Sequence, residues 1–213
     1  HVARLQAALD GLGLDGSHRL IIVLMQLVNL LQDGKPVRMS KRSGKAIALR
    51  DLLDEISVDA ARYFFNSRSP SSPLDFDLDL AVREDSENPV YYVQYANARI
   101  CSLIARLAEE GELVPAAFQV DSALLSEPEA LALVKSLAQY PEEIHLAAQS
   151  CDPSRINRYL TGLAGDFHRF YNSCRIKGEV PAVLGARLKL ADSVRQVLAL
   201  GLEVLGVAAP EKM

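Results

Sequence analysis

The stretch PVYYVQYANARICSLIARLAEE, residues 89–110, predicts a long amphipathic helix. At 3.6 residues per turn its apolar stripe consists of Val93, Ala96, Ile100, Leu103, Ile104 and Leu107. Tyr92, Tyr95 and Arg99 fall together on the neighbouring stripe. Aromatic rings and guanidinium planes stack on unpaired bases at roughly 1–3 kcal/mol per base, so this face is a candidate for binding RNA. The alternative is that the tyrosines pack against the next helix with their hydroxyls at the surface.

A second helix, from Pro153 to Ile176, repeats the arrangement. Its apolar stripe consists of Ile156, Leu160, Leu163, Phe167, Phe170 and Cys174, and the residues flanking it are His168, Tyr171 and Arg175. Arg155, Arg158, Arg169 and Lys177 add positive charge nearby. Further helical patterns cover residues 127–139, 141–149 and 182–205, with Pro in several first turns and Gly near the ends. The second half of the chain is therefore predicted to be a bundle of about five helices.

The first part of the chain mixes strand and helix signals. An apolar run from Arg19 to Leu31 is followed by Asp33-Gly34, which predicts a hairpin or tight reversal. Residues 51–56 and 59–68 predict two short helices, each with an acidic residue near its start.

A domain boundary is predicted after residues 69–73, where residues that break helices and strands are most concentrated. This segment consists of two prolines and three serines, and an acidic stretch follows it as far as Asn88. We therefore expect a mainly α protein, with a small α/β unit over residues 1–84 and an all-α helix bundle over residues 85–213.

Composition and charge limit the class of protein. The chain has 213 residues, of which 49% are hydrophobic, and no stretch of eighteen apolar residues lacks charge, so we expect a soluble, cytoplasmic protein without membrane contacts. It begins at His1 inside a helical pattern, so we expect an incomplete protein. A net charge of -4 argues mildly against binding of nucleic acid, but local basic clusters matter more than the sum. Three widely spaced cysteines predict neither disulfides nor a zinc site.

The strongest basic cluster lies between Gly34 and Arg50, where no acidic residue occurs. Its six cations are Lys35, Arg38, Lys41, Arg42, Lys45 and Arg50. The segment VRMSKRSGK mixes this charge with small residues, as suits a loop that closes over a polyphosphate and reopens. On charge alone, a solvated basic turn explains the segment equally well.

Residues 38–42, Arg-Met-Ser-Lys-Arg, resemble the Lys-Met-Ser-Lys-Ser signature of class I aminoacyl-tRNA synthetases, with Arg in place of the first Lys and of the final Ser. The segments VNLLQDG (28–34), LRDLLDE (49–55), DAARYF (59–64), LDFDLDL (74–80) and NPVYYVQYA (88–96) surround it in order. Together they are similar to arginyl-tRNA synthetases in particular. The resemblance covers nearly the whole chain and is to the C-terminal part of that family.

This resemblance implies two functional units. Residues 1–84 would be the tail of a class I catalytic domain, and residues 85–213 a helical anticodon-binding domain. Lys41 is implied as the catalytic residue that stabilises charge on the ATP phosphates while the carboxylate of arginine attacks the α-phosphorus. Arg38, Met39, Ser40 and Lys45 are implied to bind the same phosphates, and Gly44 to act as a hinge.

In the helical unit, the residues implied to contact the tRNA anticodon are Tyr92, Tyr95, Arg99, Tyr171, Arg175 and Met213. The partners implied for the whole enzyme are ATP with Mg²⁺, arginine and tRNA(Arg), and we expect a monomer with no tightly bound cofactor and no protein-held metal. The nucleotide signature and the arginine pocket are implied to lie upstream. The chain alone is therefore expected to be inactive.

Parts of the sequence also fit other functions. A non-catalytic helical RNA-binding or interaction module would explain the bundle but has no need of the loop around Lys41. Another class I synthetase, such as the cysteine enzyme, is disfavoured by the absence of zinc-ligand spacings and by the tyrosine-rich helix. The aspartates at positions 75, 77 and 79 are spaced like the opening of an EF-hand, but Leu80 and Ser86 stand where Gly and Glu are required, so calcium binding is not expected.

Overall fold

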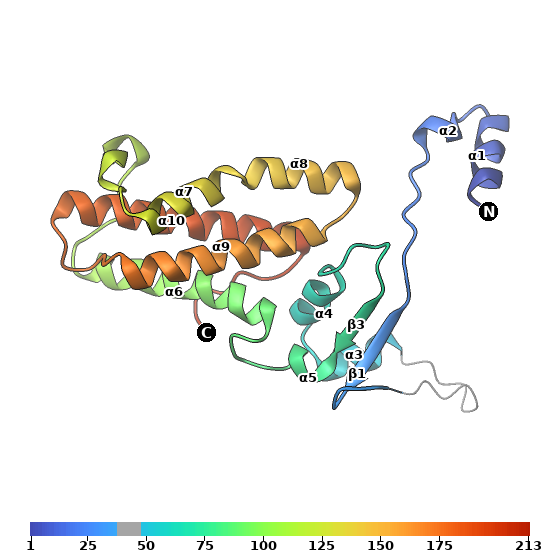
Figure 1. The fold of residues 1–213 in the computed structure, drawn as a ribbon, viewed down its shortest axis with the longest axis horizontal. Coiled ribbons are helices and arrows are strands. Elements are labelled where there is room, and N and C mark those ends of the chain that lie inside the picture. The colour runs from blue at the N-terminus through green and yellow to red at the C-terminus, as the bar shows by residue number, and fades with distance from the viewer. Residues whose placement is uncertain (38–47) are drawn as a thin grey trace.

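The computed structural model describes residues 1–37 and 48–213. Figure 1 shows long helices lying side by side, a small α/β unit at one end of them, and an N-terminal pair of helices joined to that unit by an extended segment. The mainly α fold with a small sheet is as predicted. Among the described residues, no helix combines the length and the apolar character needed to cross a bilayer.

The small sheet has the strand order β2-β1-β3. Its strands are β1 (Val28–Gln32), β2 (Lys35–Pro36) and β3 (Leu74–Asp77). β1 and β2 are antiparallel and are joined by Asp33 and Gly34, whose φ angles are +52° and +68°. Two successive positive φ values are typical of the tight turns that connect hairpin strands, so the predicted reversal is confirmed.

The acidic stretch after Pro73 is not merely a linker, because it forms β3, parallel to β1, and then α5 (Leu78–Ala81). The sequence did not predict these two elements. Asp75 accepts a hydrogen bond from an asparagine of β1 at 2.9 Å, and Asp77 caps α5 by accepting from a backbone N–H at 3.0 Å. Asp79 accepts from the backbone of the β1–β2 turn at 2.6 Å. Strand pairing and capping thus account for the aspartates whose spacing is similar to a calcium loop.

The apolar run before the turn is only partly a strand. The helices α1 (Val2–Gly11) and α2 (Gly16–Arg19) precede it, and residues 20–27 are extended without belonging to a strand. Leu24 is 70% exposed and Leu27 84% exposed. β1 begins at Val28, where β3 supplies a partner for its backbone.

The predicted helices are present, with shifts of a few residues at their ends. The α/β unit contains α3 (Leu49–Glu55) and α4 (Val58–Phe65). The bundle contains α6 (Pro89–Glu109), α7 (Pro128–Ala138), α8 (Tyr140–Ser150), α9 (Ser154–Ser173) and α10 (Pro181–Leu205), with two short 3-10 turns, η1 (Ala117–Gln119) and η2 (Ser122–Leu124), between α6 and α7.

The predicted end of α9 at Ile176 is wrong, because the backbone at Cys174 is already extended. Cys174 and Ile176 are both buried. Residues two apart point about 200° apart on a helix but toward the same side in an extended chain, so an extended segment lets both side chains reach the core.

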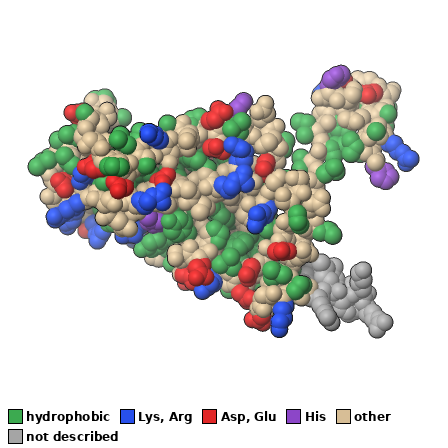
Figure 2. Space-filling view, viewed as in Figure 1, with side chains coloured by type: hydrophobic (Ala, Val, Ile, Leu, Met, Phe, Trp, Pro, Cys, Tyr) green, Lys and Arg blue, Asp and Glu red, His purple; other side chains and the backbone are tan. Residues whose placement is uncertain are grey.

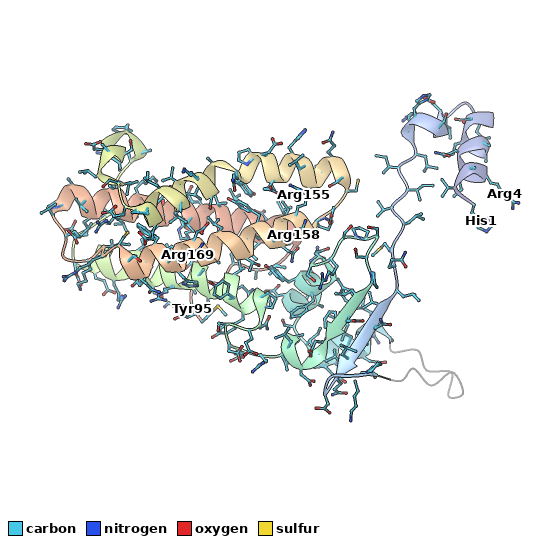
Figure 3. All side chains as sticks on the ribbon, viewed as in Figure 1. His1, Arg4, Tyr95, Arg155, Arg158 and Arg169 are labelled. Carbon is cyan, nitrogen blue, oxygen red and sulfur yellow. The ribbon has the colours of Figure 1, made fainter. Side chains whose placement is uncertain are left out.

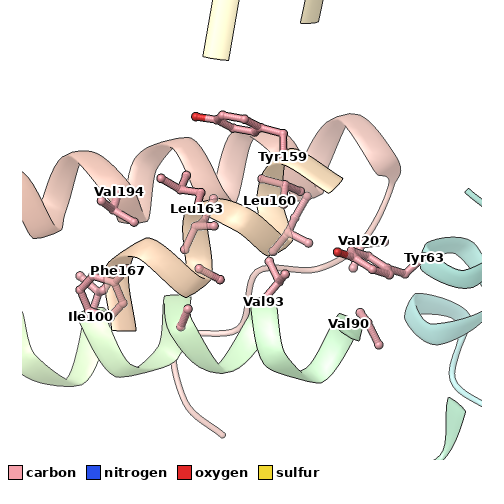
Figure 4. Close-up of a cluster of buried hydrophobic side chains, with 14 of the residues drawn as sticks. Tyr63, Val90, Val93, Ile100, Tyr159, Leu160, Leu163, Phe167, Val194 and Val207 are labelled. Atoms are coloured by element: carbon pink, nitrogen blue, oxygen red, sulfur yellow. The ribbon is translucent and has the colours of Figure 1, made fainter. Parts of the chain in front are cut away.

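The core of the bundle lies between α6, α9 and α10 (Figure 4). At its centre Val93 and Ile100 of α6, Leu163 and Phe167 of α9, and Val194 of α10 are at most 1% exposed. Burying each such side chain contributes about 1.5–3 kcal/mol. The apolar stripes predicted for α6 and α9 therefore face one another, which fixes the rotation of both helices about their axes.

A reciprocal contact joins α4 to α9. The Asn157 amide donates to the backbone carbonyl of Tyr63 at 2.9 Å, and the Tyr63 hydroxyl contacts the Asn157 carbonyl at 3.2 Å and the Thr161 hydroxyl at 2.9 Å. Tyr63 is 1% exposed, and burial raises its pKa to about 12, so the phenol stays protonated. In Figure 4 its ring lies beside Val90 and Val207, at the junction of the α/β unit and the bundle.

Replacing Asn157 with alanine should therefore loosen this junction. The variant leaves the buried carbonyl of Tyr63 without its amide partner, and we expect the free energy of unfolding to fall by about 1–3 kcal/mol. Urea denaturation followed by circular dichroism measures the change. Ser173→Ala, at an exposed position of the same helix, is the control and should stay within about 0.5 kcal/mol of the parent. Equal stability of parent and Asn157→Ala would contradict the role given to the contact.

Candidate functional site

A hollow of about 460 Å³ opens along the seam between α6 and α9. The residues that line it are Ser86, Tyr91, Tyr92, Tyr95, Arg99, His168 and Asn172. It thus brings together three of the predicted site residues, Tyr92, Tyr95 and Arg99, because they share one flank of the buried stripe of α6. We call this space the tyrosine hollow.

The aromatic rings of the tyrosine hollow are arranged as an open platform. Tyr91 and Tyr95 are nearly parallel, with ring centroids 6.2 Å apart and an interplanar angle of 6°. The His168 ring lies 4.9 Å from Tyr92 and 6.2 Å from Tyr95. Tyr95 is 40% exposed, whereas Tyr92 is half-buried. Tyr92 therefore contributes to helix packing, while the ring of Tyr95 stays accessible to a ligand.

The ionisable groups around the rings keep most of the hollow uncharged. Burial lowers the pKa of His168, and the positive charge of Arg99 lowers it further, so the imidazole is neutral near pH 7. Burial likewise raises the pKa of Tyr92, whose hydroxyl stays protonated. The Arg99 guanidinium carbon lies 4.3 Å from the centroid of the Tyr171 ring, a cation–π contact that holds this charge at one end of the hollow.

Tyr171 and Arg175 line a second, larger hollow of about 740 Å³, between the end of α6 and the start of α10. Asn172 borders both hollows. Several cations here already have protein partners, since Arg175 Nε donates to the Lys177 carbonyl at 2.8 Å and the Lys177 ammonium pairs with Glu110. Because Asn172 is common to both, this hollow adjoins the tyrosine hollow on the same face.

Met213 lies in a third hollow, of about 370 Å³, on the other side of Tyr91. The C-terminal tail is fixed there by hydrogen bonds from the side chains of Gln94 and Asn97, to the carbonyls of Ala208 at 3.0 Å and Pro210 at 2.9 Å. Met213 itself is 53% exposed. The six predicted residues of the helical unit therefore line three successive hollows, and they do not gather in one pocket.

The additional positive charge predicted for α9 is partly neutralised. Arg155, Arg158 and Arg169 lie along the helix in Figure 3, but Arg155 pairs with Glu143 at 2.9 Å and Arg169 pairs with Asp166. In Figure 2, Lys and Arg side chains recur along the bundle with Asp and Glu interspersed among them. A simple basic surface is not visible in that view, so the aromatic rings distinguish the candidate site better than its charge does.

Sequence reasoning missed three residues of the tyrosine hollow and gave a fourth only a minor place. Ser86, Tyr91 and Asn172 were not predicted as site residues, and His168 was noted only as a flanking residue. The signal was present: Tyr91 precedes Tyr95 by four residues and His168 precedes Asn172 by four, a spacing that puts side chains on the same helix face.

The predicted phosphate-binding residues lie outside the described residues. These are Arg38, Met39, Ser40, Lys41 and Lys45, together with the hinge Gly44. Within the described ranges, no group of three or more His, Cys, Asp or Glu side chains is placed to hold a metal ion.

Comparison with known proteins identifies relatives along the whole chain. Residues 93–213 match the family model described as "DALR anticodon binding domain". Curated proteins named "Arginine--tRNA ligase" from Acetivibrio thermocellus and Caldanaerobacter subterraneus subsp. tengcongensis are 51% and 52% identical over 213 residues. The match covers 100% of this chain but 38% of each relative, so the chain spans well under half their length.

Solved structures agree. A putative arginyl-tRNA synthetase from Campylobacter jejuni has a TM-score of 0.84 and 34% identity, covering 99% of this chain and 44% of that one. The arginyl-tRNA synthetase of Thermus thermophilus, at a TM-score of 0.79 and 23% identity, covers 100% of this chain and 39% of its own and shares the fold. The chain belongs to the DALR anticodon binding domain family and is homologous to the C-terminal part of arginine–tRNA ligases.

Proposed function

We propose that this chain is the anticodon-reading part of an arginine–tRNA ligase, and that the face formed by the three hollows binds the anticodon loop of tRNA(Arg). The observation that carries the proposal is the accessible Tyr95 ring beside Tyr91 and His168. Sequence-specific binding of RNA favours unpaired loop bases, which stack on such rings. Tyr171, Arg175 and Met213 would extend the contact on both sides of the tyrosine hollow.

The same proposal gives the α/β unit a role in catalysis by the longer enzyme, with the boundary between the units near residues 84 and 85. Lys41 would stabilise charge on the ATP phosphates as arginine is activated, with Mg²⁺ bound to the nucleotide. Arg38, Met39, Ser40 and Lys45 would bind the same phosphates. Support comes from their match to the class I signature and from the relatives named arginine–tRNA ligase. The cytoplasmic monomer expected from the sequence remains part of this proposal.

The competing proposal is a helical RNA-binding or interaction module without catalysis. Both proposals allow the tyrosine hollow to bind RNA, so RNA binding does not separate them. They differ in whether a protein that contains this chain attaches arginine to tRNA. Absence of arginylation by that longer protein would favour the non-catalytic module.

The first prediction for the site concerns stacking. Tyr95→Ala should weaken binding of a tRNA(Arg) anticodon stem-loop by about 1–3 kcal/mol, because a ring that stacks on a base is lost. Fluorescence anisotropy titrations at low and high salt should show a similar loss. The matched control is Phe118→Ala, which removes another exposed ring, on η1, that is 90% exposed. Equal affinity of parent and Tyr95→Ala, with both folded, would mean that the tyrosines pack against the neighbouring helix and do not stack on RNA.

The second prediction concerns charge. If Arg99 contacts one phosphate of the loop, Arg99→Gln should make the dependence of log K on log salt shallower by about 0.7, because counterion release falls. Arg4→Gln on α1 removes the same charge away from the hollow and should leave the slope unchanged. A titration series between low and moderate salt measures both slopes. The same change in the two variants would mean that only overall charge matters.

The third prediction tests the catalytic assignment in the longer enzyme. Lys41→Ala should slow activation of arginine by about 2–4 kcal/mol, because the lysine acts on charge that develops in the transition state. Binding of arginine should change little. Lys135→Ala, at an exposed position of α7, is the matched control. Unchanged activation kinetics in Lys41→Ala would remove this residue from the mechanism.

A further inference from the structure

His168 and Asn172 are residues of α9 whose hydrogen-bonding groups play no part in the proposed stacking, although the His168 ring lies beside the tyrosines. They lie four residues apart, so they share one face of the helix, and both line the tyrosine hollow opposite the α6 tyrosines. We propose that His168 and Asn172 determine specificity, by reading the hydrogen-bonding edge of one unpaired RNA base that the tyrosines stack. This inference rests on the proposed function of the same face.

The other polar side chains of α9 show why these two stand out. Asn157 and Thr161 are hydrogen-bonded to Tyr63, and Asp166 to Ser136 and Arg169. Within the described parts of the chain, no hydrogen bond engages the His168 ring or the Asn172 amide. The Tyr171 hydroxyl and Ser173 also have no side-chain hydrogen bond among the described residues, but both line the adjoining hollow. Of the α9 side chains without such a bond, His168 and Asn172 are the ones that line the tyrosine hollow.

The size and lining of the hollow fit one base. About 460 Å³ accommodates a nucleobase with part of its sugar. Tyr91 and Tyr95 come from α6 and supply nearly parallel ring faces, so a base stacked on them would turn its polar edge toward α9. Arg99 is held against the Tyr171 ring, and Ser86 lies in the turn before α6. His168 and Asn172 are therefore the polar side chains that α9 contributes to the hollow.

The imidazole of His168 and the carboxamide of Asn172 are suited to hydrogen bonding with the edge of a base. A neutral imidazole offers one donor and one acceptor, and a carboxamide offers donors and an acceptor in one plane. RNA-binding proteins identify unpaired bases by such contacts along the Watson–Crick edge. Stacking alone tolerates any base, because every base has a π face. Discrimination between bases is therefore assigned to the two α9 side chains, and affinity common to all bases to the α6 rings.

The experiment measures binding of the full chain to an anticodon stem-loop of tRNA(Arg) and to loops in which each of the three anticodon bases is replaced in turn by the other three. The parent should prefer one base at one position by about tenfold. His168→Phe keeps an aromatic ring but loses both nitrogens, and Asn172→Ala loses the amide. In either variant the ratio of affinities for the preferred and the other loops at that position should fall to about threefold or less. The main cause would be weaker binding of the preferred loop.

Three further variants separate base reading from stacking and from effects on the fold. Tyr95→Ala should weaken all loops by a similar factor and keep the preference, whereas His168→Gln restores a donor and an acceptor and should recover part of it. Phe118→Ala should match the parent. Circular dichroism confirms that every variant is folded.

The outcomes distinguish a failure of base reading by His168 and Asn172 from a failure of RNA binding at this face. If His168→Phe and Asn172→Ala keep the preference of the parent, or weaken all loops equally, the two residues do not read the base and the inference is overturned. If the parent binds no loop at all, the proposed function of this face fails, and the inference fails with it.

Discussion

The candidate site depends on the apolar seam between α6 and α9. Val93 and Ile100 on one helix and Leu163 and Phe167 on the other are at most 1% exposed, so neither helix can rotate without exposing core. Once the seam is fixed, the flank of α6 that carries the tyrosines must lie beside the flank of α9 that carries His168. The tyrosine hollow is thus a consequence of core packing. A face built on two rigid helices positions its side chains better than a loop does.

The helix α9 also connects the hollow to the α/β unit. Near the start of α9, Asn157 and Thr161 contact Tyr63 of α4. Near the end of α9, Asn172 borders the hollow. At 1.5 Å per residue, Asn157 and Asn172 are about 22 Å apart along the helix. The reciprocal Tyr63–Asn157 contact and the apolar side chains beside it keep α4 against the bundle. The face that would bind RNA and the unit that precedes it are therefore attached to the same helix.

Local sequence patterns were enough to predict much of this architecture. The helices of the bundle, the Asp33-Gly34 turn and the core stripes of α6 and α9 follow from local patterns. β3 and α5 were missed because an acidic stretch is also typical of a linker. The alternation of buried Leu74 and Phe76 with aspartates is the strand signal, and the Asn29–Asp75 hydrogen bond that supports it joins residues far apart in the sequence. The predicted set Tyr92, Tyr95 and Arg99 shares one helix face and could be grouped, whereas the separation of Arg175 and Met213 into other hollows depends on tertiary contacts and on the path of the tail.

The central claim, that unpaired anticodon bases lie on the α6–α9 face, is tested most directly by photochemical crosslinking. A tRNA(Arg) anticodon stem-loop with a photoreactive base at each anticodon position is bound to the chain and irradiated, and the crosslinked peptides are identified by mass spectrometry. The account predicts crosslinks within residues 91–99 of α6, and within residues 168–175 at the end of α9 and just after it. Crosslinks confined to α7 and α8, or to α1 and α2, would contradict it.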